Sequence, residues 1–184
     1  MKNLKKLTIL HSNDMHGDFL AEQIDQRLVG SGAIRSYSLG PVVHYADLVE
    51  CLPYDDAVYM LKVTGAQLER MLRHILRDEA FQGEHTEFYQ FSHGMHIVWS
   101  RSAQTFRTLT LDGEALYADR LYTVAMQKYH YNNLKAFLNI TLEEAEKNGR
   151  TRVLSTSARD VVEEYLMVNQ HLNRRVEGRL VVED

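Results

Sequence analysis

The sequence predicts an α+β fold, in which helices and strands alternate irregularly along a chain of 184 residues. Stretches rich in β-branched and aromatic residues, which favour strands, are separated by segments whose apolar residues repeat at helical spacing. The two kinds of segment do not follow the strand–helix–strand order that a parallel α/β sheet requires. Hydrophobic residues make up 45% of the chain and charged residues 25%, so a sizeable core can form beneath a polar surface.

The first third of the chain is expected to contain one strand, two helices and two turns. These are a strand at 7–11, a polar turn at 12–18, a helix at 19–29, a glycine turn at 30–35 and a helix at 46–52. The first helix is predicted from weak apolar periodicity. The second ends before Pro53, because the residue preceding a proline is biased away from the helical conformation.

The rest of the chain is expected to alternate between strands, helices and one aromatic loop. Strands are predicted at 57–63, 95–99, 106–111, 121–126 and 176–182, helices at 64–77, 141–147 and 158–171, and the loop at 88–94. Asp112 and Gly113 form a typical hairpin turn after one strand. Ser157 is a good N-cap for the last helix.

Composition argues against several classes of partner and location. The formal net charge of −4 gives no general attraction to nucleic acid or to an anionic membrane. Apolar runs are too short to cross a bilayer, and the N-terminal apolar segment is too short for a signal peptide. The single cysteine, Cys51, suits a reducing compartment. We therefore expect a cytoplasmic protein that binds neither nucleic acid nor membrane.

Asp14 and His16 stand two residues apart at the end of the predicted strand 7–11. A carboxylate and an imidazole at this spacing can both face one metal ion. Hydrolytic metal sites use three or more protein ligands, so these two form an incomplete site. A solvated polar turn is the alternative interpretation.

Residues 30–35 read Gly-Ser-Gly-Ala-Ile-Arg. Glycines such as Gly32 allow the backbone to approach a ligand closely, and free N–H groups in such a turn can bind an anion. Arg35 adds a planar cation suited to phosphate. The alternative is an ordinary glycine turn followed by a surface arginine.

Six short motifs, in this order, resemble the C-terminal domain of the 5′-nucleotidase family. They are Ser-Gly-Ala-Ile-Arg at 31–35, Leu-Pro-Tyr at 52–54, Val-Thr-Gly at 63–65, Phe-Tyr-Gln-Phe-Ser at 88–92, Leu-Asp-Gly-Glu at 111–114 with Tyr-Thr-Val-Ala at 122–125, and Glu-Gly-Arg at 177–179. The resemblance implies a substrate-binding domain over residues 30–184.

Residues 7–17 resemble the opening of the same family's metallophosphoesterase domain. Asp14 and His16 match its first two metal ligands, but the family's Asn-His and His-x-His elements have no counterpart here. The resemblance therefore implies that residues 1–29 are a remnant of a catalytic domain that is otherwise missing. The complete family site holds divalent metal ions. In this chain we expect no bound metal and no phosphatase activity from the chain alone.

The resemblance also implies a nucleotide site. Arg35, in the turn that contains Gly32, matches the family's arginine that contacts substrate phosphate or nearby oxygens. The family sandwiches the base between two aromatic rings. Phe91, or else Phe88, matches one ring by its place before Ser92.

Tyr129 matches the second ring by its place seven residues after Tyr122. The family follows this ring with Gly-Gly-Asp-Gly, whereas this chain has Asn-Asn-Leu-Lys at 132–135. Asn132 is a substitute hydrogen-bonding group for the sugar or the base. The alternative interpretation is that these aromatic residues only pack in the core.

Two functions follow from these observations. The first is nucleotide or nucleoside recognition for a 5′-nucleotidase-like phosphoester hydrolase. A variant of this hypothesis is that a separate chain supplies the catalytic domain. The second is a non-catalytic interaction module that forms a homodimer through the surface left by the missing domain. His93, His96 and His130 are expected to be ordinary surface or core histidines.

Overall fold

The computed structural model describes residues 26–36, 39, 42–82, 89–170 and 176–184. The strands, in chain order, are β1 (Gln26–Gly30), β2 (Val58–Thr64), β3 (Tyr89–Phe91), β4 (Met95–Ser100), β5 (Thr105–Leu111), β6 (Glu114–Ala115), β7 (Leu121–Gln127), β8 (Arg152–Ser155) and β9 (Leu180–Glu183). The α-helices are α1 (Tyr45–Cys51), α2 (Gly65–Ile75), α3 (Lys128–Asn132), α4 (Leu134–Leu138), α5 (Leu142–Glu146) and α6 (Ala158–Val168). Two 3₁₀ helices are η2 (Ser31–Ala33) and η3 (Asp78–Phe81).

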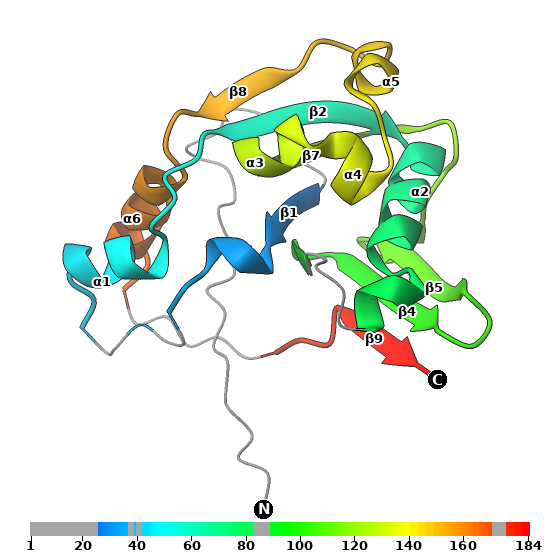
Figure 1. Ribbon diagram of the computed structural model, residues 1–184, viewed down its shortest axis with the longest axis horizontal. Helices are drawn as coiled ribbons and strands as arrows, with labels where there is room; N and C mark the ends of the chain where they lie inside the picture. Colours follow the sequence, from blue (N-terminus) through cyan, green and yellow to red (C-terminus); the bar gives the residue numbers. More distant parts are fainter. Residues whose placement is uncertain (1–25, 37–38, 40–41, 83–88, 171–175) are drawn as a thin grey trace, which may run out of the picture.

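The strands form two sheets, which confirms the predicted α+β class (Figure 1). The five-stranded sheet has the order β3-β1-β7-β2-β8, and the four-stranded sheet has the order β6-β5-β4-β9. In the larger sheet, β1 is parallel to β7, while the β1–β3, β7–β2 and β2–β8 pairs are antiparallel. In the smaller sheet, β4 is antiparallel to β5 and parallel to β9.

Helix α2 contributes to a hydrophobic core that both sheets share. It begins at Gly65, and the hydroxyl oxygen of the preceding N-cap residue, Thr64, accepts a hydrogen bond from the backbone N–H of Gln67. Its predicted apolar stripe is buried together with Val124 of the larger sheet and Ile97 of the smaller one. The stripe consists of Leu68, Met71, Leu72, Ile75 and Leu76, and all five are buried. The helical periodicity of the sequence is therefore confirmed here.

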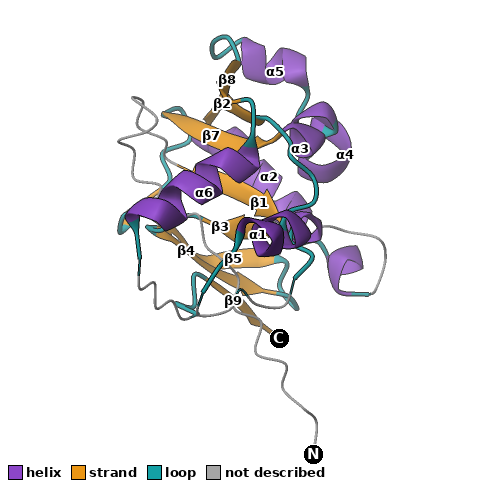
Figure 2. Ribbon diagram, turned by 90° about the vertical axis from the view of Figure 1, so that its left-hand side faces the viewer, coloured by secondary structure: helices purple, strands orange, loops and turns teal. Residues whose placement is uncertain are grey.

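Helices α1 and α6 lie side by side, away from the four-stranded sheet (Figures 1 and 2). Ser157 caps α6 as predicted, because its hydroxyl oxygen accepts a hydrogen bond from the backbone N–H of Asp160. The guanidinium of Arg159 donates hydrogen bonds to the carbonyl oxygens of Leu52 and Pro53. These bonds attach the start of α6 to the end of α1.

The hairpin turn after β5 also forms as predicted. Asp112 and Gly113 both have positive φ angles, 52° and 83°, the conformation that a two-residue hairpin turn of type I′ requires. Within the described residues, no helix combines the length and the apolar character needed to cross a membrane.

Two predicted elements differ from the structure. The expected helix at 19–29 is wrong over its last residues, because β1 occupies 26–30 between two other strands. The weak apolar periodicity of that segment is overridden by pairing with strands that lie far away in the sequence. The boundary expected after residue 29 falls within β1. The strand expected at 7–11 lies outside the described residues.

The expected loop at 88–94 is replaced in part by a strand, β3. Tyr89 and Phe91 are buried and Gln90 is half-buried, which is the alternation of a strand with one face on the core. The short elements α3, α4 and β8 were not predicted. None of them exceeds five residues, too few to produce a clear periodic pattern.

Candidate functional site

Two of the predicted site segments directly follow neighbouring parallel strands. β1 and β7 run in the same direction, with Leu28 opposite Met126, so both strands end at the same edge of the sheet. The turn that contains Gly32 follows β1, and the helix that contains Tyr129 follows β7. The fold therefore brings together two segments that are far apart in the sequence.

Two more strand ends lie at this edge. Tyr89, the first residue of β3, is opposite Gly30, the last residue of β1. Val58, the first residue of β2, is opposite Gln127, the last residue of β7. We call these four strand ends, at Gly30, Tyr89, Gln127 and Val58, the site edge.

Tyr129 presents an aromatic ring at the site edge. The residue lies in α3 and is 49% exposed. Its ring packs against the rings of His130, with a centroid distance of 5.4 Å, and Phe137 of α4, at 5.5 Å. A supported ring with an open side is suited to stacking on a flat ligand.

His130, the next residue along α3, is buried instead, at 2% exposure. Its Nδ1 atom lies 2.9 Å from the hydroxyl oxygen of Tyr89, within a buried hydrogen bond. His130 therefore connects α3 to β3. The sequence gives no periodic signal for this contact, because the two residues are 41 positions apart.

Arg35 is exposed beyond the end of β1. Its backbone N–H donates a 2.8 Å hydrogen bond to the carbonyl oxygen of Cys51, which ties the turn to the end of α1. Its guanidinium carbon lies 5.3 Å from the centre of the Tyr54 ring. Gly32 is half-buried within η2. The predicted anion turn therefore carries an accessible cation with an aromatic neighbour.

The loop that carries Tyr54 is fixed by the start of α6. Arg159 binds the carbonyl oxygens of Leu52 and Pro53, and Asp55 accepts hydrogen bonds from the Ser157 hydroxyl and the Arg159 backbone N–H. Burial raises the pKa of Asp55, but these hydrogen bonds and the Arg159 charge lower it below its ordinary value overall. Asp55 is thus held as a carboxylate.

The structure places Phe91 in the hydrophobic core, at 3% exposure. A ring packed on its neighbours offers no open face to a base, so the stacking role expected for Phe91 does not fit this position. Its carbonyl oxygen accepts a 2.8 Å hydrogen bond from Arg179. Phe88, the other predicted ring, lies outside the described residues.

Asn132 is exposed at the end of α3, as a sugar- or base-binding side chain would have to be. Its neighbour Asn133 has a different role. The Asn133 side-chain amide donates a 2.8 Å hydrogen bond to the carbonyl oxygen of Tyr129. Asn133 therefore fixes the main chain of the helix that carries the exposed ring.

Gln127 ends β7 and is 7% exposed, and its amide oxygen has no hydrogen-bond partner among the residues that the structure describes. A buried acceptor without a donor carries a desolvation cost. The indole N–H of Trp99, in β4, likewise has no partner within the described part of the chain.

The predicted metal ligands Asp14 and His16 lie outside the described residues. Across the part of the chain that the structure describes, no group of three or more His, Cys, Asp or Glu side chains is arranged to hold a metal ion.

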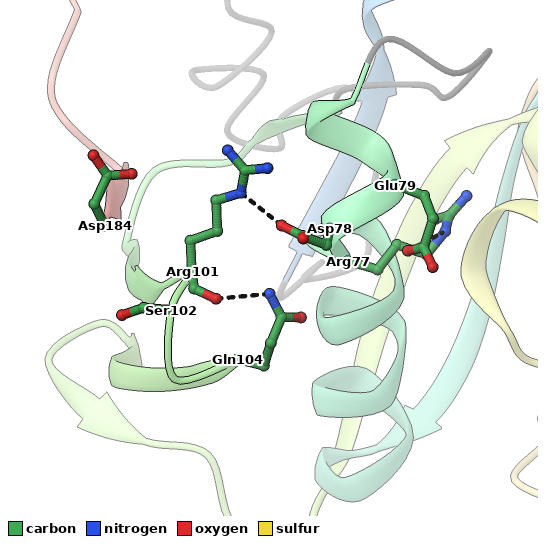
Figure 3. Close-up of a pocket in the computed structure, with 7 residues that line it drawn as sticks. All are labelled: Arg77, Asp78, Glu79, Arg101, Ser102, Gln104 and Asp184. Carbon is green, nitrogen blue, oxygen red and sulfur yellow. Dashed lines mark hydrogen bonds and ion pairs between the residues drawn. The ribbon is translucent and has the colours of Figure 1, made fainter.

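A cavity of about 820 Å³ lies between the end of α2 and the turn that joins β4 to β5 (Figure 3). Arg101 Nε donates a 2.6 Å hydrogen bond to Asp78, and Arg77 Nε lies 3.9 Å from a Glu79 carboxylate oxygen. Each guanidinium therefore faces a carboxylate. The lining also includes Ser102, Gln104 and Asp184, and contains none of the predicted site residues.

Known structures share this fold. A 5′-nucleotidase precursor from Thermus thermophilus superposes with a TM-score of 0.67 at 16% identity, covering 86% of this chain and 31% of its own. An NAD nucleotidase from Haemophilus influenzae gives 0.69 at 12% identity, with coverages of 88% and 30%. A sulfate thiohydrolase from Thermus thermophilus gives 0.63 at 17% identity, with coverages of 86% and 29%. The chain therefore spans less than a third of each of these proteins.

Among curated proteins, no match is found. The family model described as "5′-nucleotidase, C-terminal domain" matches residues 22–140, which include β1, the Gly32–Arg35 turn and α3. The match covers more than half of the chain, and the fold agrees with it. The chain belongs to the family of 5′-nucleotidase C-terminal domains.

Proposed function

We propose that this chain recognises a nucleotide or nucleoside at the site edge, as the substrate-binding domain of a 5′-nucleotidase-like phosphoester hydrolase of nucleotide catabolism. The observation that carries the proposal is the half-exposed residue Tyr129, which follows β7 at the edge where the Gly32–Arg35 turn follows β1. The names of two similar structures, a 5′-nucleotidase and an NAD nucleotidase, support this class of ligand.

In this proposal Tyr129 stacks on the base. Base–aromatic stacking is worth about 1–3 kcal/mol. Arg35 attracts the phosphate or nearby oxygens through charge-assisted hydrogen bonds, and the backbone around Gly32 approaches the same group. Asn132 donates to the sugar or to the base edge. Phe88 is the second ring of the proposed sandwich.

The chain by itself binds the ligand without cleaving it. Asp14 and His16 supply two metal ligands, whereas hydrolysis of a phosphate ester by metal-activated water needs a more complete donor set. The family's divalent ions, and the chemistry they supply, therefore come from a domain that this sequence does not contain. A catalytic domain on a separate chain is one source.

Calorimetric titration of the full chain with AMP, adenosine and inorganic phosphate tests the proposal. We expect saturable binding of AMP and adenosine with about millimolar affinity, near −4 kcal/mol, because half of the family's site is missing. We also expect no metal-dependent release of phosphate from AMP. Absence of binding by both nucleosidic ligands, in a folded protein, would reject nucleotide recognition.

A second candidate function is a non-catalytic interaction module that forms a homodimer. The observation in its favour is that two edge strands expose apolar side chains: Val153 on β8, and Val181 and Val182 on β9. Open strand edges can pair with another chain. Sedimentation over a range of protein concentrations separates this candidate from the first, because it requires a concentration-dependent dimer and no nucleotide binding.

We further propose a cytoplasmic location. Its support is the single cysteine, Cys51, which is a buried free thiol.

A further inference from the structure

Helix α3 presents consecutive residues to opposite environments. An α-helix turns by about 100° per residue, so neighbours along it face different directions. Tyr129 is 49% exposed, whereas His130 is 2% exposed. The burial of His130 therefore directs the preceding ring toward solvent.

The His130 ring is held on several sides. Its Nδ1 atom and the Tyr89 hydroxyl oxygen are joined by a 2.9 Å hydrogen bond. The ring meets Tyr89 edge-on, with centroids 5.0 Å apart and planes at 64°. It meets Phe137 of α4 at 5.8 Å and 75°. Strand β3 and helix α4 together fix this imidazole in place.

The held imidazole in turn contacts the exposed ring. Tyr129 and His130 form an edge-to-face pair with centroids 5.4 Å apart and planes at 82°, a favoured arrangement for aromatic pairs. The side-chain amide of Asn133 also donates a hydrogen bond to the backbone carbonyl oxygen of Tyr129. Helix α3 has only five residues, so tertiary contacts rather than its own length must set its orientation.

We propose that His130 is a positioning residue for ligand binding: its hydrogen bond to Tyr89 anchors α3 on β3 and holds the Tyr129 ring ready to stack on a base. The stacking part of this inference rests on the proposed function. The anchoring part concerns the ligand-free protein and can be tested without any ligand.

The test compares two substitutions of His130, to side chains of similar size, with one substitution of Tyr89 and one control, all in the full chain. His130→Gln keeps a polar group able to bond the Tyr89 hydroxyl, whereas His130→Leu removes that ability and keeps bulk. Tyr89→Phe removes the hydroxyl from the other side. Tyr131→Phe serves as the control, because Tyr131 also lies in α3 but bonds the Thr151 hydroxyl. Thermal unfolding establishes that each variant is folded.

The first measurement is the NMR spectrum of the Tyr129 ring without ligand, assigned by its loss in Tyr129→Phe. We expect Tyr89→Phe to shift the ring signals and Tyr131→Phe to leave them near their original positions. His130→Leu should shift them further than His130→Gln, because both variants lose the neighbouring imidazole ring but only the Leu variant also loses the bond to Tyr89. Equal spectra in the Leu and Gln variants would overturn the anchoring role.

The second measurement is adenosine affinity by calorimetry. We expect His130→Leu to weaken it by about threefold to tenfold, the range that one hydrogen bond supplies, and His130→Gln to restore most of the loss. The double variant His130→Leu/Tyr89→Phe should lose less than the sum of the two single losses, because both changes break the bond between His130 and Tyr89. Additive losses would overturn the coupling.

The two measurements separate this inference from the proposed function. If the unsubstituted chain binds no adenosine, the proposed function fails, and the ring spectra alone decide whether His130 anchors α3. If adenosine binds and His130→Leu matches the original affinity, the positioning role fails while nucleotide recognition stands.

Discussion

The guanidinium of Arg35 lies over the ring of Tyr54, 5.3 Å from its centre, and the backbone N–H of Arg35 bonds the last residue of α1. The ring supports one face of the guanidinium, while the residue as a whole is exposed. The cation is therefore partly oriented before any ligand arrives. An oriented cation loses less conformational freedom when it binds an anion.

Arg35→Ala should weaken AMP binding by about tenfold or more, because hydrogen bonds to charged groups contribute about 1.5–3 kcal/mol. Adenosine, which lacks the phosphate, should lose much less affinity. Calorimetric titration of both ligands measures the difference. Arg107→Ala is the matched control, since Arg107 is an exposed arginine of the four-stranded sheet that pairs with Glu183. Equal losses for the two ligands would argue against a phosphate contact.

Tyr129→Ala should weaken adenosine and AMP binding alike, by about fivefold or more, because the ring stacks on the base that both ligands share. Tyr129→Phe keeps the ring and should retain most of the affinity. Tyr117→Ala provides a control at another exposed tyrosine. Unchanged affinity in Tyr129→Ala would place the base elsewhere.

The sequence was sufficient to predict the elements that depend on local patterns. The stripe of α2, the Asp112–Gly113 turn and the Ser157 cap depend on local patterns, and each has the predicted structure. β1 could not be predicted, because its conformation depends on pairing with β3 and β7. Its own residues carry a weak helical pattern.

The candidate site likewise has features that the sequence could predict and features that depend on packing. The resemblance predicts roles for Arg35 and Tyr129, and the structure places both at exposed positions. It also selected Phe91, which the core buries, because a motif does not say which of its aromatic side chains faces inward. The bond between His130 and Tyr89 joins residues 41 positions apart and follows only from the packing of α3 on β3.

Glu144 should make the free energy of unfolding depend on pH in the acidic range. Hydrogen bonds from the Thr141 backbone and from Arg70 lower the pKa of its carboxyl group to about 2, from about 4.5. Because this pKa is lower in the folded state than in the unfolded state, the ionised carboxylate stabilises the fold at pH values above about 4.5. That stabilisation is lost as the pH falls from about 4.5 towards about 2.

Glu144→Gln should therefore flatten the acid side of the stability curve over this interval. Glutamine can still take part in the capping box at Thr141, so the variant removes mainly the charge. Urea unfolding at a series of pH values measures the effect. Glu143→Gln, at an exposed neighbouring position, should leave the slope unchanged. Parallel curves for the original protein and Glu144→Gln would refute the linkage.

Gln127→Leu should raise the free energy of unfolding by about 1 kcal/mol, because it removes a buried amide oxygen that has no partner in the described residues. Gln67→Leu is the opposite case. The Gln67 side-chain oxygen accepts hydrogen bonds from the Thr64 backbone and the Asn148 side chain, so its loss should lower stability. Urea unfolding of both variants gives the comparison, and a destabilised Gln127→Leu would show that the amide is needed.

NMR titration of the isotope-labelled full chain with AMP tests nucleotide recognition at the site edge most directly. The predicted result is saturable movement of the Tyr129 ring signals and of the Gly32 and Arg35 amide signals, with Arg107 and Tyr117 unmoved. Saturation confined to the four-stranded sheet, or no saturable movement well above about 1 mM AMP, would contradict nucleotide recognition at this edge.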